Sequence, residues 1–332
     1  MTPGVAWHEA EVEIPTTSGV LTGTLSLPVG LPRPAVMLIG GTFSDLRDGD
    51  ADPRHRPDIP PHGMYRVLAH GLAAAGLAVL RFDRRGSGGS SGARPSRAEE
   101  IDDAAAAWRW LGTDPRVQGA AAMVGESAGA YVLCRLAGAG ILPRAAVLQG
   151  ALHRTISGLI EFNGRRARAF YERGPEAAGW MWEHARHEYE SAVLLDATLE
   201  AISSGRLASV RARDDRIELD RSLEGLRYDL EFAPADQFAA LTCPTLVLHG
   251  ADDLNVPVED ALATLRSLRE AGNRSAELVV LAGADHSMQS TPDDPEERLR
   301  ERMTFASFLR PYHPRYPAVV VEHLRRIVDR GD

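Results

Sequence analysis

Short apolar runs, separated by turns rich in glycine and proline, alternate along the chain with longer stretches in which apolar residues recur at helical spacing. The later runs are almost continuously apolar, which is typical of parallel strands covered by helices on both faces. The pattern therefore predicts an α/β fold. Eight strands are expected, at Glu11–Ile14, Val20–Leu27, Ala35–Ile39, Ala78–Phe82, Ala121–Val124, Ala145–Leu148, Thr245–His249 and Glu277–Leu281.

Helices are expected between these strands, and two of them have recognisable ends. Ser96 and Glu99 have the spacing of a capping box in front of an amphipathic stretch. Another helix is predicted over Tyr65–Ala75, closed by Gly76 as a C-terminal cap. A last helix is expected over Pro311–Ile327, where Val319, Val320, Leu324 and Ile327 share one face. Two roles stay open for that face, packing on the sheet and a homodimer contact.

The pattern changes in the middle of the chain to charged, aromatic-bearing helical sequence without a convincing buried strand. We therefore predict a core domain formed by residues 1–151 and 241–332, with residues 152–240 inserted as a helical lid. The aromatic residues of this insertion either line a pocket or attach the insertion to the core. They are Phe162, Phe170, Tyr171, Trp180, Trp182 and Tyr189.

Composition and charge narrow the function classes. The 332 residues include 37 basic and 46 acidic side chains, and a net charge of −9 disfavours a nucleic-acid partner. Every basic residue is arginine, which excludes P-loop and Schiff-base lysines. Cys134 and Cys243 lack the clustering of a metal site and fit a reducing cytosol. With no signal peptide and no apolar run of ~18 residues, we expect a cytoplasmic protein outside the membrane.

The strongest chemical signal is the sequence Gly125-Glu126-Ser127-Ala128-Gly129, which follows an apolar strand and precedes a helical run. It matches the motif G-x-S-x-G in its required strand–turn–helix context. Glycines are needed because the sharp, strained turn that exposes the serine leaves no room for side chains two positions away on either side.

An acid and a histidine follow the serine in the order Ser…Asp…His. Asp252 and Asp253 come directly after the strand at Thr245–His249, and Asp285-His286 follows the last strand. Each group is on a loop beyond the carboxyl end of a strand, the edge at which ligands and catalysis gather in open α/β sheets. The sequence therefore predicts that these side chains meet Ser127.

These motifs resemble the α/β-hydrolase family, and the resemblance covers nearly the whole chain outside the insertion. Gly250–Pro257 is similar to the family's acid loop, and Phe82–Gly88 looks like its turn after the fourth strand. Residues Leu38–Gly49 resemble bacterial esterases and thioesterases with a dienelactone-hydrolase-like or acyl-peptidase-like core. The resemblance implies an eight-stranded, mostly parallel sheet flanked by helices.

The resemblance also implies roles for individual residues. Ser127 would be the nucleophile, His286 the general base and then acid, and Asp253 the group that orients the imidazole. Asp253 is preferred to Asp252 because it matches the family spacing of three after Gly250.

An oxyanion hole is implied by the same resemblance. It would use the backbone N–H of Ala128 and one from Thr42 or Phe43. Many relatives carry His-Gly where this chain has Gly40-Gly41, and a backbone donor can survive that change.

Other polar residues near these motifs have competing interpretations. Glu126 is expected to pack or form a salt bridge rather than supply charge beside the nucleophile. His62, in a proline-rich loop with several acids, is expected to be solvated rather than to bind a metal. Arg165, Arg166 and Arg168 are expected on a solvated helix face; their alternative role is binding an acidic substrate or the phosphates of coenzyme A.

The leading functional hypothesis is a serine hydrolase that forms an acyl-enzyme on Ser127 and passes the acyl group to water. By resemblance, its substrate would be a small-molecule acyl ester or thioester. The triad chemistry requires no metal and no organic cofactor. Two alternatives stay open: an acyltransferase or cyclising enzyme of secondary metabolism that uses the same triad, and a binding protein that keeps the fold without turnover.

Overall fold

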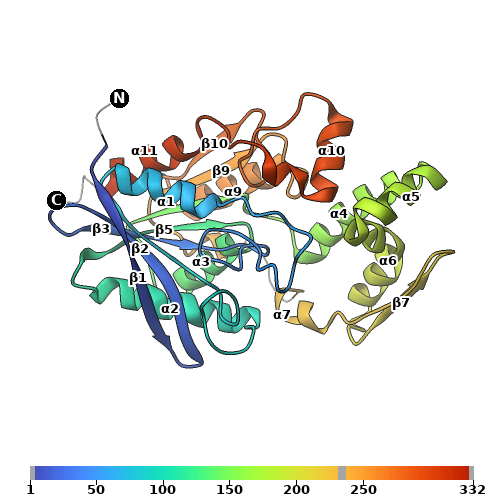
Figure 1. Cartoon of the computed structure of the whole chain (residues 1–332), viewed down its shortest axis with the longest axis horizontal. Coiled ribbons are helices and arrows are strands. Elements are labelled where there is room, and N and C mark those ends of the chain that lie inside the picture. The colour runs from blue at the N-terminus through green and yellow to red at the C-terminus, as the bar shows by residue number, and fades with distance from the viewer. Residues whose placement is uncertain (1–3, 231–236, 329–332) are drawn as a thin grey trace.

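One sheet contains all eight strands that the apolar runs predict (Figure 1). The computed structural model describes residues 4–230 and 237–328. The strands are β1 (Trp7–Thr16), β2 (Gly19–Pro28), β3 (Arg33–Ile39), β4 (Ala78–Phe82), β5 (Val117–Glu126), β6 (Ala145–Gln149), β9 (Thr245–Gly250) and β10 (Glu277–Leu281). Their order is β1-β2-β4-β3-β5-β6-β9-β10. Only the β1–β2 and β2–β4 pairs of this sheet are antiparallel, which confirms the mostly parallel arrangement.

Helices cover both faces of the sheet, so its central strands are buried on both sides. On one face, α1 (Met64–Ala74) and α11 (Tyr316–Val328) pack in a common apolar cluster with alternate strand residues. On the other face, α2 (Arg97–Thr113), α3 (Ala128–Gly138) and α9 (Val258–Glu270) bury a second cluster. This two-sided burial explains why the later strands are continuously apolar in sequence.

Local signals set the helix ends in two of these elements. The Ser96 hydroxyl accepts the N–H of Glu99, whose carboxylate accepts the N–H of Ser96, so the expected capping box begins α2. Gly76 follows the end of α1 with a φ of 91°, the left-handed conformation that favours glycine.

The last helix begins later than the sequence pattern predicts, at Tyr316 rather than Pro311. The residues in front of it pair instead with the loop after β10. The N–H of Ser290 donates to the carbonyl of Pro311 at 2.8 Å, and the N–H of His313 donates to the carbonyl of Met288 at 2.8 Å. The apolar face of α11 is buried against α1 and the sheet within the same chain.

An insertion leaves the sheet after β6 and lies beside it, in green to yellow in Figure 1. It contains α4 (Ile156–Tyr171), α5 (Pro175–His184), α6 (Arg186–Ser203), β7 (Val210–Arg213), β8 (Glu218–Arg221), η1 (Glu224–Leu226) and α7 (Arg227–Leu230). The β7–β8 hairpin was not expected from the sequence. Its strands have four residues each and are mostly exposed, so they lack the apolar pattern of a buried strand.

Most aromatic residues of the insertion form a small core of their own. Phe170, Trp180 and Tyr189 pack with Met303 of α10 (Pro295–Thr304), a helix that follows β10. These rings therefore attach the insertion to the core domain rather than line the main cavity. In the part of the chain that the structure describes, no helix is long and apolar enough to cross a membrane.

Candidate active site

Ser127 occupies a strained turn between β5 and α3. Its backbone has φ 51° and ψ −116°, a conformation that is rare for a residue with a side chain. The glycines on either side are required by contact. A Cβ at Gly129 would lie 2.0 Å from the carbonyl oxygen of Ile39, and one at Gly125 would lie 2.5 Å from that of Gly129. The turn places Ser127 at the wall of a cavity at the carboxyl edge of the sheet.

His286 and Asp253 form a buried hydrogen-bonded pair in this region. His286 Nδ1 lies 2.6 Å from Asp253 Oδ2. The other oxygen of Asp253 accepts the N–H groups of Asn255 at 2.7 Å and Val256 at 2.9 Å, which fixes the carboxylate. Burial alone would raise the pKa of Asp253, but the charge of His286 and its hydrogen bond lower that pKa below the usual value.

The two neighbouring acids have other partners. Asp252 accepts a 2.8 Å hydrogen bond from Thr291 and pairs with Arg298 at 2.6 Å, so it ties the acid loop to α10 and to the segment before it. Asp285 accepts the N–H groups of Ser287 and Gln289, which shapes the turn that carries the histidine. Burial raises the pKa of Asp285 to about 6. Of the three acids, Asp253 is thus the one that is hydrogen-bonded to the imidazole.

The second nitrogen of His286 faces another carboxylate. Its Nε2 lies 3.7 Å from Glu126 Oε1. Burial alone would lower the pKa of His286, but the charges of Asp253 and Glu126 outweigh it and raise this pKa to about 9. Ser127 and His286 line the same cavity, although no hydrogen bond joins their side chains in the structure. Such hydrogen bonds are often long before substrate binds.

Glu126 also holds the loop after β3. Its Oε2 accepts the N–H of Gly41 at 2.9 Å and the hydroxyls of Ser44 and Tyr65 at 3.3 Å. From the other side, Arg84 donates to the carbonyl of Gly41 at 2.6 Å. The loop is thus oriented without the histidine that many relatives carry. Glu126 therefore has the packing role that the sequence predicts. It also places a carboxylate next to His286, which is close to the alternative role that the sequence made less favoured.

The predicted oxyanion-hole residues lie around this loop and the turn. Thr42 and Phe43 line the cavity. Ala128 is the first residue of α3, where backbone N–H groups have no acceptor within the helix. Thr42 and Phe43 therefore line the same cavity as Ser127, and Ala128 follows Ser127 at the positive end of α3.

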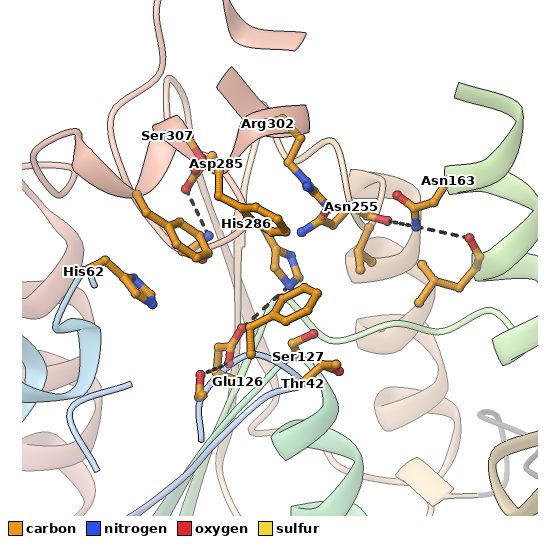
Figure 2. Close-up of a pocket in the computed structure, with 17 residues that line it drawn as sticks. Thr42, His62, Glu126, Ser127, Asn163, Asn255, Asp285, His286, Arg302 and Ser307 are labelled. Carbon is orange, nitrogen blue, oxygen red and sulfur yellow. Dashed lines mark hydrogen bonds and ion pairs between the residues drawn. The ribbon is translucent and has the colours of Figure 1, made fainter. Parts of the chain in front are cut away.

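The cavity itself has a volume of about 240 Å³ and a partly aromatic wall (Figure 2). Phe43 and Phe305 meet edge to face, with ring centroids 5.4 Å apart. His62 stacks on Phe308 at 4.2 Å and lies 2.7 Å from the carbonyl oxygen of Gly49 through Nε2. His62 was expected in a solvated loop. Contacts from the far end of the chain bring it into the wall instead.

A second cavity, of about 410 Å³, lies within the insertion between α4, α6 and the segment around Leu223. Leu159, Asn163 and Arg302 line both cavities, so the two spaces adjoin. Sequence analysis missed Arg302, because its neighbours on α10 form a charged surface run with no recognisable motif.

The arginine cluster of α4 differs from the solvated face that was expected. Arg165 is exposed and pairs with Glu161, and Arg168 pairs with Asp196. Arg166 instead points inward and lines the second cavity. The physical reason is that helical spacing gives neighbouring residues different directions, so one of the three faces the interior.

The described residues include no group of three or more histidine, cysteine or acidic side chains that could hold a metal ion. The acids near His62 already have partners. Asp50 accepts the backbone N–H groups of His62 and Gly63, and Asp58 pairs with Arg56. A serine, a histidine and carboxylates line the main cavity, an arrangement suited to nucleophilic acyl transfer.

Comparison with known proteins adds a family to this geometry. Residues 59–302 match the sequence profile described as "Alpha/beta hydrolase family". Two strains of Mycobacterium tuberculosis each have an uncharacterized protein that is 35% identical over 130 residues, or 38% of this chain. The aligned part spans only 40% of those curated relatives.

Solved structures that resemble the chain include esterases. The esterase Pf2001 of Pyrococcus furiosus has a TM-score of 0.58 at 19% identity, over 97% of this chain and 92% of that one. The hydrolase GrgF of Penicillium has a TM-score of 0.57 at 17% identity, over 97% and 99%. Est1E of Butyrivibrio proteoclasticus, solved with ferulic acid, has a TM-score of 0.53 at 16% identity, over 90% and 98%. At these identities the likeness establishes a common fold.

Proposed function

Because the chain belongs to the alpha/beta hydrolase family, we propose that it is a serine hydrolase that cleaves a carboxylic ester or thioester. The observation that carries the proposal is that Ser127, on its strained turn, lines the same cavity as the hydrogen-bonded pair His286–Asp253. A serine is a weak nucleophile unless a base takes its proton, and this pair supplies an oriented base in the same cavity.

The reaction proceeds in two halves. In the first, Ser127 Oγ attacks the carbonyl carbon while His286 takes the hydroxyl proton, and the alcohol or thiol leaves with that proton, so an acyl-enzyme forms. In the second, His286 takes a proton from water, the resulting hydroxide attacks the acyl group, and the acid leaves as Ser127 recovers its proton. Asp253 holds the imidazole and stabilises its charged form throughout.

Backbone N–H groups would stabilise the oxyanion of each tetrahedral intermediate. We assign this role to the N–H of Ala128 and to that of Thr42 or Phe43. The support is that Thr42 and Phe43 line the cavity, that Ala128 directly follows Ser127, and that Glu126 and Arg84 hold the loop at Gly41 from both sides.

The insertion is assigned the role of a lid that selects the substrate, with residues 152–240 as its bounds and residues 1–151 and 241–332 as the core. The support is that Leu159 and Asn163 of α4 form part of the wall of the main cavity. We expect water to be the acyl acceptor. If products formed with competing alcohols or amines outweigh the free acid, the protein is an acyltransferase.

The decisive test is covalent labelling with a fluorophosphonate, read by intact mass. We expect one adduct on the wild-type protein and none on Ser127→Ala, because the reagent needs an activated serine. Ser307→Ala is the matched control, since Ser307 lines the same cavity and should leave labelling intact. Far-UV circular dichroism checks that all three proteins are folded. A folded wild type without an adduct, or a labelled Ser127→Ala, would contradict the proposal.

A further inference from the structure

Arg302 lies at the junction of the two cavities and is mostly buried. Its side chain is 17% exposed and extends from α10 toward His286 and Asn255 (Figure 2). It lines both the cavity that contains Ser127 and the larger cavity in the insertion. Neither the fold nor the proposed reaction steps require a guanidinium at this place.

The guanidinium of Arg302 is only partly satisfied. Its Nε donates to Asn255 Oδ1, but Nη1 has no hydrogen-bond partner in the described part of the chain. The carboxylate nearest to this nitrogen is Glu188, whose Oε1 lies 3.7 Å away, beyond hydrogen-bond distance. That oxygen is taken by Arg166 Nη2 at 2.9 Å. A buried donor without a partner costs free energy, so its presence needs an explanation.

Within 4 Å of the Arg302 and Arg166 guanidiniums, the described residues supply one carboxylate, Glu188, so positive charge is in excess at the junction of the cavities. Asp253 and Asp285 act on Arg302 from a greater distance. Arg166 Nε has no hydrogen-bond partner among the described residues. His187 does not add charge at neutral pH, because burial lowers its pKa to about 4. Burial and the neighbouring charge of Arg166 lower the pKa of Arg302 to about 10, so the guanidinium stays protonated.

The carboxylates around the main cavity already accept hydrogen bonds from other residues. Asp253 is hydrogen-bonded to His286, and Asp285 accepts two backbone N–H groups. Glu126 accepts the N–H of Gly41 and two hydroxyls. No carboxylate oxygen of these three residues lies within 4 Å of a guanidinium nitrogen of Arg302. The Arg302 guanidinium, which lines both cavities, is therefore a positive charge without a close ionic partner beside the space that a substrate would occupy.

We propose that Arg302 binds a carboxylate carried by the substrate, so that this enzyme acts on anionic esters or thioesters. The inference rests on the proposed hydrolase function and names its substrate class. A guanidinium edge suits a carboxylate, because two parallel hydrogen bonds can form between them. The reacting carbonyl would lie at Ser127, and the carboxylate at the junction of the cavities. Apolar side chains line the space beyond the junction, namely Ile160, Leu194, Leu195, Leu223 and Leu226.

The test compares pairs of esters in which a carboxylate of one replaces a methyl group of the other. On the acyl side, 4-nitrophenyl hydrogen glutarate is matched with 4-nitrophenyl pentanoate. On the leaving-group side, the pentanoate of 3-hydroxybenzoic acid is matched with that of 3-methylphenol. For each pair, the readout is the ratio of kcat/KM for the anionic ester to that for the neutral one, after subtraction of the spontaneous reaction.

We expect Arg302→Met to lower this ratio by about 10- to 100-fold in at least one pair, mainly through KM, since a hydrogen bond to a charged group is lost. Arg302→Lys should give a ratio between those of the wild type and Arg302→Met, because lysine keeps the positive charge but cannot form two parallel hydrogen bonds to a carboxylate. Arg300→Met is the matched control: Arg300 is on the same helix but pairs with Glu296 outside both cavities. Ratios that stay unchanged in Arg302→Met for both pairs would overturn the proposal.

A binding measurement separates this inference from the proposed function. Monomethyl glutarate, which carries one carboxylate, should bind Ser127→Ala more tightly than the neutral methyl pentanoate by calorimetry, and Arg302→Met in that background should remove the difference. This result does not depend on turnover. Absence of fluorophosphonate labelling in the wild type would contradict the hydrolase, whereas equal binding of monomethyl glutarate and methyl pentanoate would contradict the role of Arg302.

Discussion

Asp252 and Asp253 carry the same functional group at adjacent positions, yet the fold gives them different tasks. Asp253 is fully enclosed and bonded to His286, whereas Asp252 is partly exposed and pairs with Arg298. The loop after β9 turns between them, so one carboxylate faces the histidine and the other faces α10. Substitution of each by asparagine should therefore separate catalysis from loop structure.

We predict that Asp253→Asn lowers kcat by about 10²- to 10⁴-fold, because the imidazole loses its orientation and the stabilisation of its charged form. Asp252→Asn should keep kcat within about threefold and cost at most about 1 kcal/mol of stability, as expected for a partly exposed ion pair. Steady-state kinetics with an activated ester and urea unfolding provide the two measurements. Equal losses of kcat in both variants would contradict the assignment of Asp253.

Glu126 should set the pH at which His286 becomes a base. The pKa of His286 is raised to about 9 by Asp253 and Glu126 against the opposing effect of burial. Since a general base must be neutral, we expect kcat/KM to rise with pH with a midpoint above ~6.5, the ordinary value for histidine.

Glu126→Gln keeps an oxygen that can accept the N–H of Gly41 but removes the negative charge. We expect it to lower the midpoint of the pH profile by about one unit, because an opposite charge close to the imidazole is lost. The profile of kcat/KM between pH 5 and 10 measures this. An unshifted midpoint in a variant that still turns over would show that Glu126 acts only on the loop.

At the scale of elements, the turn between β5 and α3 depends on close backbone contact. A Cβ at Gly129 would meet the carbonyl oxygen of Ile39 at 2.0 Å, and backbone cannot yield as a flexible side chain can. At the other end of the same helix, a Cβ at Gly138 would have no atom within 4 Å. The two glycines therefore offer a matched comparison within one helix.

Gly129→Ala should lower the free energy of unfolding by about 3 kcal/mol or prevent folding, and should reduce labelling of Ser127, because the helix must move away from β3. Gly138→Ala should be neutral or stabilising by up to about 1 kcal/mol, since it lowers the entropy of the unfolded chain. Urea unfolding and fluorophosphonate labelling test both effects. A Gly129→Ala protein with wild-type stability would contradict the contact.

Helix α10 connects the core domain with the insertion. Met303 enters the aromatic cluster of the insertion, while Arg302, its neighbour, lines both cavities. Arg173 of the insertion pairs with Glu296 at the start of the same helix at 2.8 Å. An element outside the insertion thus carries the residue to which we assign substrate charge recognition.

For the whole molecule, the raised pKa of His286 makes stability depend on pH. The folded protein binds the proton more tightly than the unfolded chain, whose histidines titrate near ~6.5. The stabilisation from the charged imidazole is therefore fully present below about pH 6.5, and it is lost as the pH rises toward 9. We predict that the free energy of unfolding falls across this window.

Urea unfolding of the wild type and His286→Gln at pH 6 and pH 9.5 measures this contribution. The difference in stability between the two proteins should be larger at pH 6 than at pH 9.5. Comparison of the two proteins removes the effect of other titrating groups. A difference that stays constant or grows toward high pH would contradict the raised pKa.

The sequence by itself determined the fold and the order of the reacting groups. The central strands could be found because burial on both faces leaves an apolar run that is readable over five or six residues. The turn at Ser127 could be found because its strained backbone tolerates only glycine at Gly125 and Gly129. Both signals are local: the residues that create them are neighbours along the chain.

Only the tertiary structure decided how the polar side chains combine. It set Glu126 beside the imidazole of His286 and brought His62 into the cavity wall. It also turned Arg302, within a run of charged residues on α10, toward the cavities. Each outcome depends on segments that are distant in sequence and meet only in the fold, and no pattern along the chain records the direction in which such a side chain points.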